Sequence, residues 1–152
     1  MPAPLHTYDL KLVQFILGGR DISGYAEDGG IEIAPSADIG TPAVGSVGDA
    51  VFSRSNNFSG LITVTLGEWT QGYAVLSELM QTQEKIEGAL EPLDLLIYDP
   101  LNGDKFKDRW AAFTKRPNGD KGAVAGERVI EIFCPNLFHP DFVVLGENYL
   151  NI

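Results

Sequence analysis

The chain has 152 residues, a net charge of −10 at neutral pH, 44% hydrophobic residues and 21% charged residues. This length lets one domain bury about 70% of its unfolded surface without disulfides or metals, and we expect a single domain over residues 1–152. The excess of acidic residues argues against direct binding of nucleic acid, which depends on Lys and Arg. The single cysteine, Cys134, excludes an intramolecular disulfide.

Signals for export and membrane insertion are missing from this sequence. The N-terminus lacks a basic leader with a small-residue cleavage site, and no window approaches the roughly 20 apolar residues of a membrane span. We therefore expect a soluble protein with no membrane partner. The 17 glycines and 9 prolines indicate many turns and favour a β-rich fold.

The first part of the chain has the pattern of short strands joined by tight turns. Pro2 and Pro4 predict an extended segment over residues 1–7. Gly18-Gly19 predicts a two-residue hairpin turn, because glycine accepts the positive φ that such turns require. These signals predict a β-meander with strands at 8–17, 20–25 and 31–34 and turns at 18–19 and 27–30.

A stretch of small and polar residues at 35–49 precedes the predicted centre of the sheet. Such a stretch cannot form a packed core, so we expect a long loop, either one that reaches a neighbouring molecule or a flexible surface loop. Within Ala50–Trp69, the part from Phe58 to Leu66 is rich in Thr, Val, Ile and Leu and has no Pro or charge. It predicts a long central strand.

One helix is predicted at about 71–86, with Thr70 as its N-cap and Gly88 after its end. Its apolar and core-facing positions form one stripe: Val75, Leu76, Leu79, Met80 and Gln83. We expect this stripe to cover a face of the sheet. Use of the same stripe as a docking face for a partner is the alternative.

The region after the helix predicts a three-stranded antiparallel meander. The tetrapeptide Asn-Gly-Asp-Lys occurs at 102–105 and again at 118–121, and Asn-Gly favours type I′ hairpin turns. Trp110 and Phe113 are expected in or near the core. The strands are predicted at 93–99, 105–116 and 124–134, with another short strand at 142–145. The predicted fold class is mainly β: a small antiparallel β-sandwich or barrel with one flanking α-helix.

The sequence carries few candidates for catalysis or metal binding. His6 and His139 lie far apart along the chain, without a nearby cysteine or suitably spaced carboxylates, so the sequence predicts no zinc site. Gly40–Ser46 has the glycine spacing of a phosphate-binding loop but lacks its lysine. Asp99–Asp104 lacks the ligand spacing of a calcium loop. We expect no metal, no cofactor and no enzymatic activity.

Two other function classes stay open. A monomeric binding module for a carbohydrate or a protein would expose an aromatic platform such as Trp69 with Tyr73. A small carboxylate hydrolase would need two acids facing each other across a cleft. The candidate pairs of acids are Asp94 with Asp99 and Glu127 with Glu131.

Two runs of sequence and the predicted helix together resemble a known family. The runs are Ile16–Tyr25 (ILGGRDISGY) and Phe52–Leu66 (FSRSNNFSGLITVTL), and the helix carries Leu76-Ser77 and Leu79. Over about residues 10–100 this pattern resembles the tail tube proteins of contractile-tailed bacteriophages, whose fold is shared with the tube of type VI secretion systems. The resemblance implies a small β-barrel or sandwich with a flanking helix.

The resemblance also implies a structural role in a virion. Such proteins would be assembled in the host cytoplasm into stacked, hexameric rings that form the hollow tail tube. The implied partners are further copies of the chain, the tail sheath, and baseplate and tail terminator proteins. Phage DNA would pass through the tube without specific binding, and an acidic channel suits this role because it repels phosphates.

Alternation along the strands and position in the chain predict which residues serve this assembly. The side chains expected to line the channel are Ser59, Thr63, Thr65, Glu127 and Glu131. The residues expected to contact a neighbouring subunit or the next ring are Ser36, Asp38, Thr41, Val44, Asp49, Arg54, Asn56 and Asn57. Arg54 is expected to pair with an acid of the next subunit.

Overall fold

The computed structural model describes residues 5, 7–25 and 30–149. The extended segment expected at 1–7 and the turn expected at 27–30 lie almost wholly outside these residues. The described elements, in chain order, are η1 (Leu10–Leu12), β1 (Gln14–Leu17), β2 (Arg20–Asp21), β3 (Ile31–Pro35), β4 (Gly40–Val44), β5 (Ala50–Arg54), β6 (Gly60–Gly67), α1 (Gln71–Lys85), β7 (Leu93–Tyr98), β8 (Lys105–Lys115), β9 (Glu127–Cys134) and η2 (Glu147–Tyr149).

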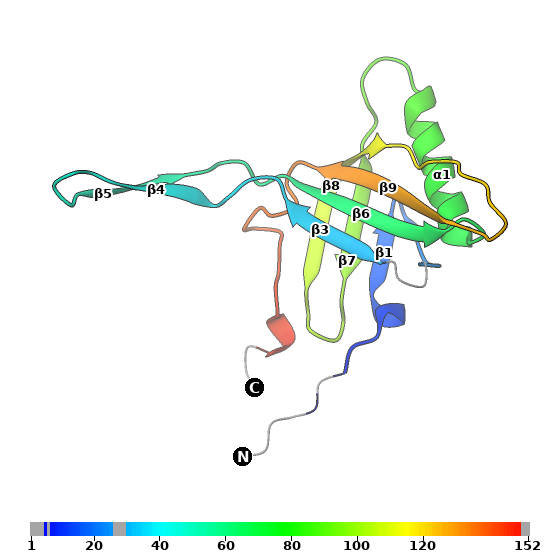
Figure 1. The fold of residues 1–152 in the computed structure, drawn as a ribbon, viewed down its shortest axis with the longest axis horizontal. Coiled ribbons are helices and arrows are strands. Elements are labelled where there is room, and N and C mark those ends of the chain that lie inside the picture. The colour runs from blue at the N-terminus through cyan, green and yellow to red at the C-terminus, as the bar shows by residue number, and fades with distance from the viewer. Residues whose placement is uncertain (1–4, 6, 26–29, 150–152) are drawn as a thin grey trace.

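Seven strands form one antiparallel sheet in the order β2-β1-β7-β8-β9-β6-β3. The long strand β8 pairs first with β7 and then with β9, with a register shift in each ladder, so it belongs to both halves of the sheet. Figure 1 shows the strands of these halves crossing, with α1 beside them. Among the described residues the end strands β2 and β3 do not pair, so the barrel stays open. The predicted mainly β, antiparallel sandwich with one flanking helix is confirmed.

The hydrophobic core lies between the two halves of the sheet. In β6, the side chains of Ile62, Val64 and Leu66 are fully buried, and the residues between them keep partial exposure. Burial of each such side chain stabilises the fold by roughly 1.5–3 kcal/mol. The facing half of the sheet contributes Phe15 and Leu95 to the same core. β6 pairs with β3 on one side and β9 on the other, so the predicted long interior strand is present, but it lies next to the edge strand β3 rather than at the centre of the sheet.

Helix α1 begins and ends as predicted. The Thr70 hydroxyl oxygen accepts a hydrogen bond from the Tyr73 backbone N–H at 3.3 Å, which is an N-cap interaction. Gln83 is buried on the inner stripe, and its amide donates to the Ala111 carbonyl and accepts from the Phe113 backbone N–H. These two bonds satisfy the backbone of β8 next to its bulge. The stripe therefore covers the sheet, as predicted.

Glycine is required in the β1–β2 turn and at the start of α1. Gly18 and Gly19 have φ values of +60° and +80° in the β1–β2 hairpin, which confirms the predicted tight turn. A Cβ on Gly72 would lie 1.8 Å from the carbonyl oxygen of Ser23, so the first turn of α1 can pack against residue 23 only with glycine at this position.

Several predicted strand boundaries are wrong. The strand expected at 8–17 is shortened to β1, because residues 10–12 form the 3₁₀ helix η1. The return strand expected at 20–25 is limited to β2, and β3 pairs with β6 rather than with β2. The early meander is therefore not formed. Its third strand instead forms one edge of the larger sheet by pairing with β6, a long-range contact that local sequence signals do not report.

The meander β7-β8-β9 is confirmed, but the turn chemistry differs from the prediction. Gly103 has φ +86°, whereas no non-glycine residue of the described chain has positive φ, so Asn102 does not adopt the type I′ conformation. The second Asn-Gly pair lies in an irregular connection between β8 and β9. The short strand expected at 142–145 is reduced to a single bridge between Val144 and Lys105.

The connection between β8 and β9 is held by one buried arginine. The Arg128 side chain is 3% exposed and donates to the Glu68 carboxylate at 2.5 Å and to the Asp120 carbonyl at 3.0 Å. A hydrogen bond from the Gly126 backbone is the main cause that lowers the pKa of Glu68, with further lowering from the charges of Lys121 and Arg128. Glu68 is therefore held in its charged form, which pairs with the buried guanidinium.

Candidate assembly surfaces

The segment expected to be a long loop is a hairpin that projects from the body of the protein. β4 and β5 pair only with each other, in register from Gly40 opposite Arg54 to Val44 opposite Ala50. The Ser55 backbone N–H donates to the Ile39 carbonyl at 2.9 Å and closes its base. Figure 1 shows this projecting hairpin extending away from the sheet. The predicted loop at 35–49 is thus wrong in structure, since its second part and the residues after it form a two-stranded ribbon.

The two faces of the projecting hairpin differ in composition. Directly opposed residues of an antiparallel pair point to the same side, so Pro42, Val44 and Phe52 share one face. Val44 is 72% exposed and Phe52 is 56% exposed, with the Phe52 ring lying over Gly40. The opposite face carries Val51 between small and hydroxyl residues. We call the side with Pro42, Val44 and Phe52 the apolar hairpin face.

An isolated two-stranded hairpin is marginally stable in water. The projecting hairpin nevertheless exposes five apolar side chains to solvent: Ile39, Val44, Val47, Val51 and Phe52. Nothing in the described part of the chain covers them. Exposed apolar ribbons of this kind mark an interaction surface, because their burial against another molecule would stabilise both the contact and the ribbon itself.

All eight residues predicted to contact a neighbouring subunit are exposed. Four of them (Thr41, Val44, Asp49 and Arg54) lie within the projecting hairpin, and the other four lie just before or after it in the chain. Among these, Asn57 accepts hydrogen bonds through its side chain from the Ser59 backbone N–H and hydroxyl. Arg54 has no ion-pair partner among the described residues. Pro42 and Phe52, which dominate the apolar hairpin face, were not predicted as contact residues: Pro42 lies within the predicted loop at 35–49, and Phe52 lies between that loop and the predicted central strand. The adjacent Val51-Phe52 pair was the available signal of a strand.

A second candidate surface lies on the outer side of β3, β6 and β9. Thr63 stands directly opposite Glu32 of β3 and Glu131 of β9, and Thr65 stands opposite Val129. Adjacent strands are about 4.8 Å apart, so the two carboxylate-bearing residues flank Thr63 at about 10 Å from each other. We name this surface the acidic face, and its members are Glu32, Thr63, Thr65, Glu127, Val129 and Glu131.

The acidic face brings together four of the five residues predicted to line a channel. Glu127 stands opposite Gly67 at one end of the face, and Glu131 accepts a hydrogen bond from the Thr114 hydroxyl at 2.9 Å. Ser59 is the exception, because it is only 8% exposed and donates to Asn57, so its hydroxyl is not available on this surface of the subunit. Glu32 is the acid that the sequence analysis missed, since its strand was assigned to a different neighbour.

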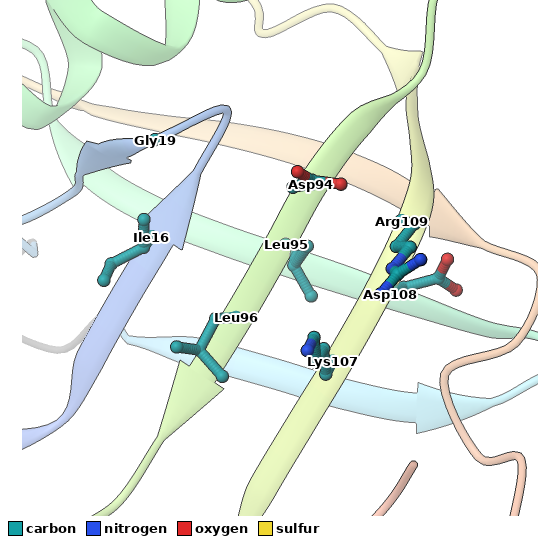
Figure 2. Close-up of a pocket in the computed structure, with 8 residues that line it drawn as sticks. All are labelled: Ile16, Gly19, Asp94, Leu95, Leu96, Lys107, Asp108 and Arg109. Atoms are coloured by element: carbon teal, nitrogen blue, oxygen red, sulfur yellow. The ribbon is translucent and has the colours of Figure 1, made fainter. Parts of the chain in front are cut away.

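A groove follows the outer face of β1, β7 and β8. Figure 2 shows Ile16 and Leu96 along it, with Asp94 on β7 and Lys107 and Arg109 on β8. Its volume is about 560 Å³. A hollow of about 400 Å³ adjoins it between β8 and the segment after β9, where Trp110 and Phe142 lie.

A β-bulge in strand β8 shapes the boundary between this groove and the hollow. The register moves from Leu95 opposite Asp108 to Leu93 opposite Ala111. The Asp108 carboxylate turns inward and accepts from the backbone N–H groups of Trp110 and Asn136, both at 2.8 Å. Arg109 and Trp110 are consequently both exposed, which is why Trp110, 57% exposed, is not the core residue that the sequence predicted.

The geometry gives little support to the two other function classes. Glu127 and Glu131 lie four positions apart on β9, or roughly 13 Å between backbones, whereas the carboxyl groups of glycosidases stand about 5–9.5 Å apart. Tyr73 packs against the core, and the Arg128 guanidinium carbon lies over its ring, 5.9 Å from the ring centroid. Trp69 therefore stands exposed without the expected Tyr73 platform.

The described residues, 5, 7–25 and 30–149, include neither a group of candidate metal ligands nor a membrane-spanning helix. In that part of the chain, no group of three or more His, Cys, Asp or Glu side chains is placed to hold a metal ion. None of its helices has the length and apolar character needed to cross a membrane. Cys134 is buried in the core, and this burial is the main cause that raises the pKa of its thiol to about 12.

The fold is similar to solved structures from contractile injection systems. The anti-feeding prophage cap, described as a tube-terminating cap, matches with a TM-score of 0.55 at 13% identity, over 88% of this chain and 91% of that chain. The sheath/tube terminator of the PVC extracellular contractile injection system in its extended state matches with a TM-score of 0.55 at 14% identity, over 87% of this chain and 95% of that chain.

A chain of the PVC sheath-tube complex in the extended state matches with a TM-score of 0.52 at 15% identity, over 88% of this chain and 87% of that chain. At these identities the similarity shows a shared fold. No family model matches the sequence, and no curated protein matches it.

Proposed function

We propose that this chain is a structural subunit of a phage-tail-like contractile tube and acts by assembling with further copies of itself. The observation that carries the proposal is the projecting hairpin, whose apolar face has no cover within the described chain. The fold similarity to tube-associated components of injection systems, which spans most of each chain, supports the same role. The role is non-enzymatic and needs no cofactor.

In the proposed assembly, copies form a ring by head-to-tail contacts that close by rotation, and rings stack into a tube. β3, at one end of the sheet, and the short β2 at the other leave strand edges that a neighbouring copy can extend. The apolar hairpin face contacts an adjacent subunit or the next ring, and Arg54 pairs there with an acid. A hexameric ring is the form expected from the resemblance in sequence.

The acidic face is proposed to line the channel. Glu32, Glu127 and Glu131 would repel phosphates, and the two threonines would offer small, uncharged contacts, so DNA could slide without being retained. Sheath, baseplate and terminator proteins are the further partners of such a tube, and the assembled particle would be a virion tail or a related injection device.

A ring that terminates the tube is a second candidate function. Two of the similar solved structures are themselves a tube-terminating cap and a sheath/tube terminator. The two roles differ in a measurable property: a tube subunit stacks without limit, whereas a terminating ring stops at a defined particle. Sedimentation velocity of concentrated protein separates an open distribution of sizes from one ring-sized species.

Excision of the projecting hairpin tests self-assembly. The hydrogen bond between Ser55 and Ile39 brings the ends of the hairpin together, so residues 40–54 can be replaced by Gly-Gly with little strain on the body. We expect the excised variant to keep the melting behaviour of the folded body and to sediment as a monomer where the full chain assembles. Assembly of the excised variant at the concentrations of the full chain would contradict the proposal.

A further inference from the structure

Three cations stand in one row on the outer face of β8. Lys105, Lys107 and Arg109 occupy alternate positions and are all exposed, so their side chains leave the same side of the strand about 6.7 Å apart. Within the described residues none of the three takes part in an ion pair. The arginines and lysines that do are Arg20, Arg116, Lys121 and Arg128. We call the three cations the basic row.

The basic row borders a surface that can hold an extended chain. Lys107 and Arg109 line both the groove over β1 and β7 and the hollow beside Trp110, so the basic row borders both spaces. Ile16 and Leu96 give the groove an apolar wall, as Figure 2 shows. A bound segment would thus find charge along one side and apolar contact along the other.

The aromatic hollow extends this surface at the Arg109 end. Phe142 is 50% exposed, and its ring lies 5.2 Å from the His139 ring between centroids. Trp110 faces the same hollow from β8. Exposed aromatic side chains next to a cation are typical of the central contacts of protein interfaces. The hollow can take one apolar or aromatic side chain from the end of a bound segment.

We propose that the basic row and its groove bind an extended, acidic segment of a partner protein. Alternate side chains of an extended peptide repeat at the same spacing as the basic row, so carboxylates at every second position can each meet one cation. The complementarity stands out in a protein of net charge −10, where cations left without an acid are available to an acidic partner.

The same observations disfavour a nucleic acid as the occupant. The net charge of −10 and Asp94 on the groove wall repel anions, and this repulsion grows with the number of charges on the bound molecule, so it opposes a nucleic acid most strongly. A short peptide brings few charges and also uses the apolar wall, which a phosphate backbone does not. This proposal concerns a different surface from the acidic face and the projecting hairpin, so it does not depend on ring formation.

The experiment measures binding of a fluorescein-labelled synthetic peptide with glutamates at three alternate positions, apolar residues between them and a terminal tryptophan. Binding to the purified full chain is followed by fluorescence anisotropy at low and at high salt. The charge-reversal variant Lys107→Glu/Arg109→Glu is expected to weaken binding by about tenfold or more. Wild-type affinity is expected to fall as salt rises, since exposed charges are screened.

The matched control is Lys85→Glu/Lys115→Glu, which changes the net charge equally at exposed lysines away from the groove. It is expected to bind the peptide almost as the wild type does. The proposal is overturned if the wild type does not bind the peptide, if both double variants weaken binding equally, or if a single-stranded oligonucleotide binds the wild type more tightly than the peptide. Thermal melts of both variants check that each is folded.

Discussion

Replacing Val44 and Phe52 by serine should abolish assembly while leaving the subunit folded. Both side chains belong to the apolar hairpin face, at 72% and 56% exposure. Full burial of such a side chain contributes roughly 1.5–3 kcal/mol, so burial of the exposed part against a neighbour contributes roughly 1–2 kcal/mol for each residue. Loss of both weakens each hairpin contact by roughly 2–4 kcal/mol, which corresponds to a factor of roughly 30 to 700 in the association constant.

The assay is sedimentation velocity over a series of concentrations, with thermal unfolding followed by circular dichroism. Since neither side chain is buried in the subunit, the melting of the variant should match the wild type within about 0.5 kcal/mol. Val51→Ser is the control, because Val51 is 63% exposed but lies on the opposite face of the hairpin. Assembly of the double variant at wild-type concentrations would refute the role of the apolar hairpin face, and an equal loss in Val51→Ser would refute its one-sidedness.

Two further predictions concern the fold that carries these surfaces. Gly72→Ala should destabilise the subunit by roughly 2 kcal/mol or more, lowering the melting temperature by roughly 4–8 °C, because its Cβ would meet the Ser23 carbonyl oxygen at 1.8 Å, although alanine favours helices by about 1 kcal/mol. Gly119→Ala, with no neighbour within 4 Å, is the control and should change stability by less than about 0.5 kcal/mol; a stable Gly72→Ala variant would show that the contact can relax. The lowered pKa of Glu68 stabilises the fold above the ordinary glutamate pKa, and this contribution is lost as the pH falls through the lowered value. Glu68→Gln should therefore be less stable than wild type at neutral pH, with the difference shrinking in melts at pH values that fall below the ordinary glutamate pKa; a constant difference would contradict the pairing with Arg128.

Those parts of the fold that depend on neighbouring residues in sequence were predictable. The N-cap at Thr70 and the apolar stripe of α1 are encoded within one helix, and the alternation of β6 separates its buried face from its Thr face. The tight turn at Gly18-Gly19 follows from the same local logic. The order β7-β8-β9 also followed, because consecutive strands joined by turns usually pair.

The parts that depend on long-range contacts could not be predicted. β3 pairs with β6, which lies beyond the projecting hairpin, and no local pattern specifies that partner. Trp110 is turned outward by a bulge that the inward Asp108 carboxylate stabilises through two backbone N–H groups. The pairing of β3 with β6 places Glu32 on the acidic face, so only part of the candidate channel surface could be predicted from the sequence.

Cryo-electron microscopy of the concentrated 152-residue chain tests the central claim most directly. We predict closed rings, alone or stacked, with the acidic face of β3, β6 and β9 turned towards the bore and the projecting hairpin of each copy seated on a neighbour. A protein that remains monomeric at the highest concentration it reaches, or rings whose bore is lined by another surface, would contradict the proposed account.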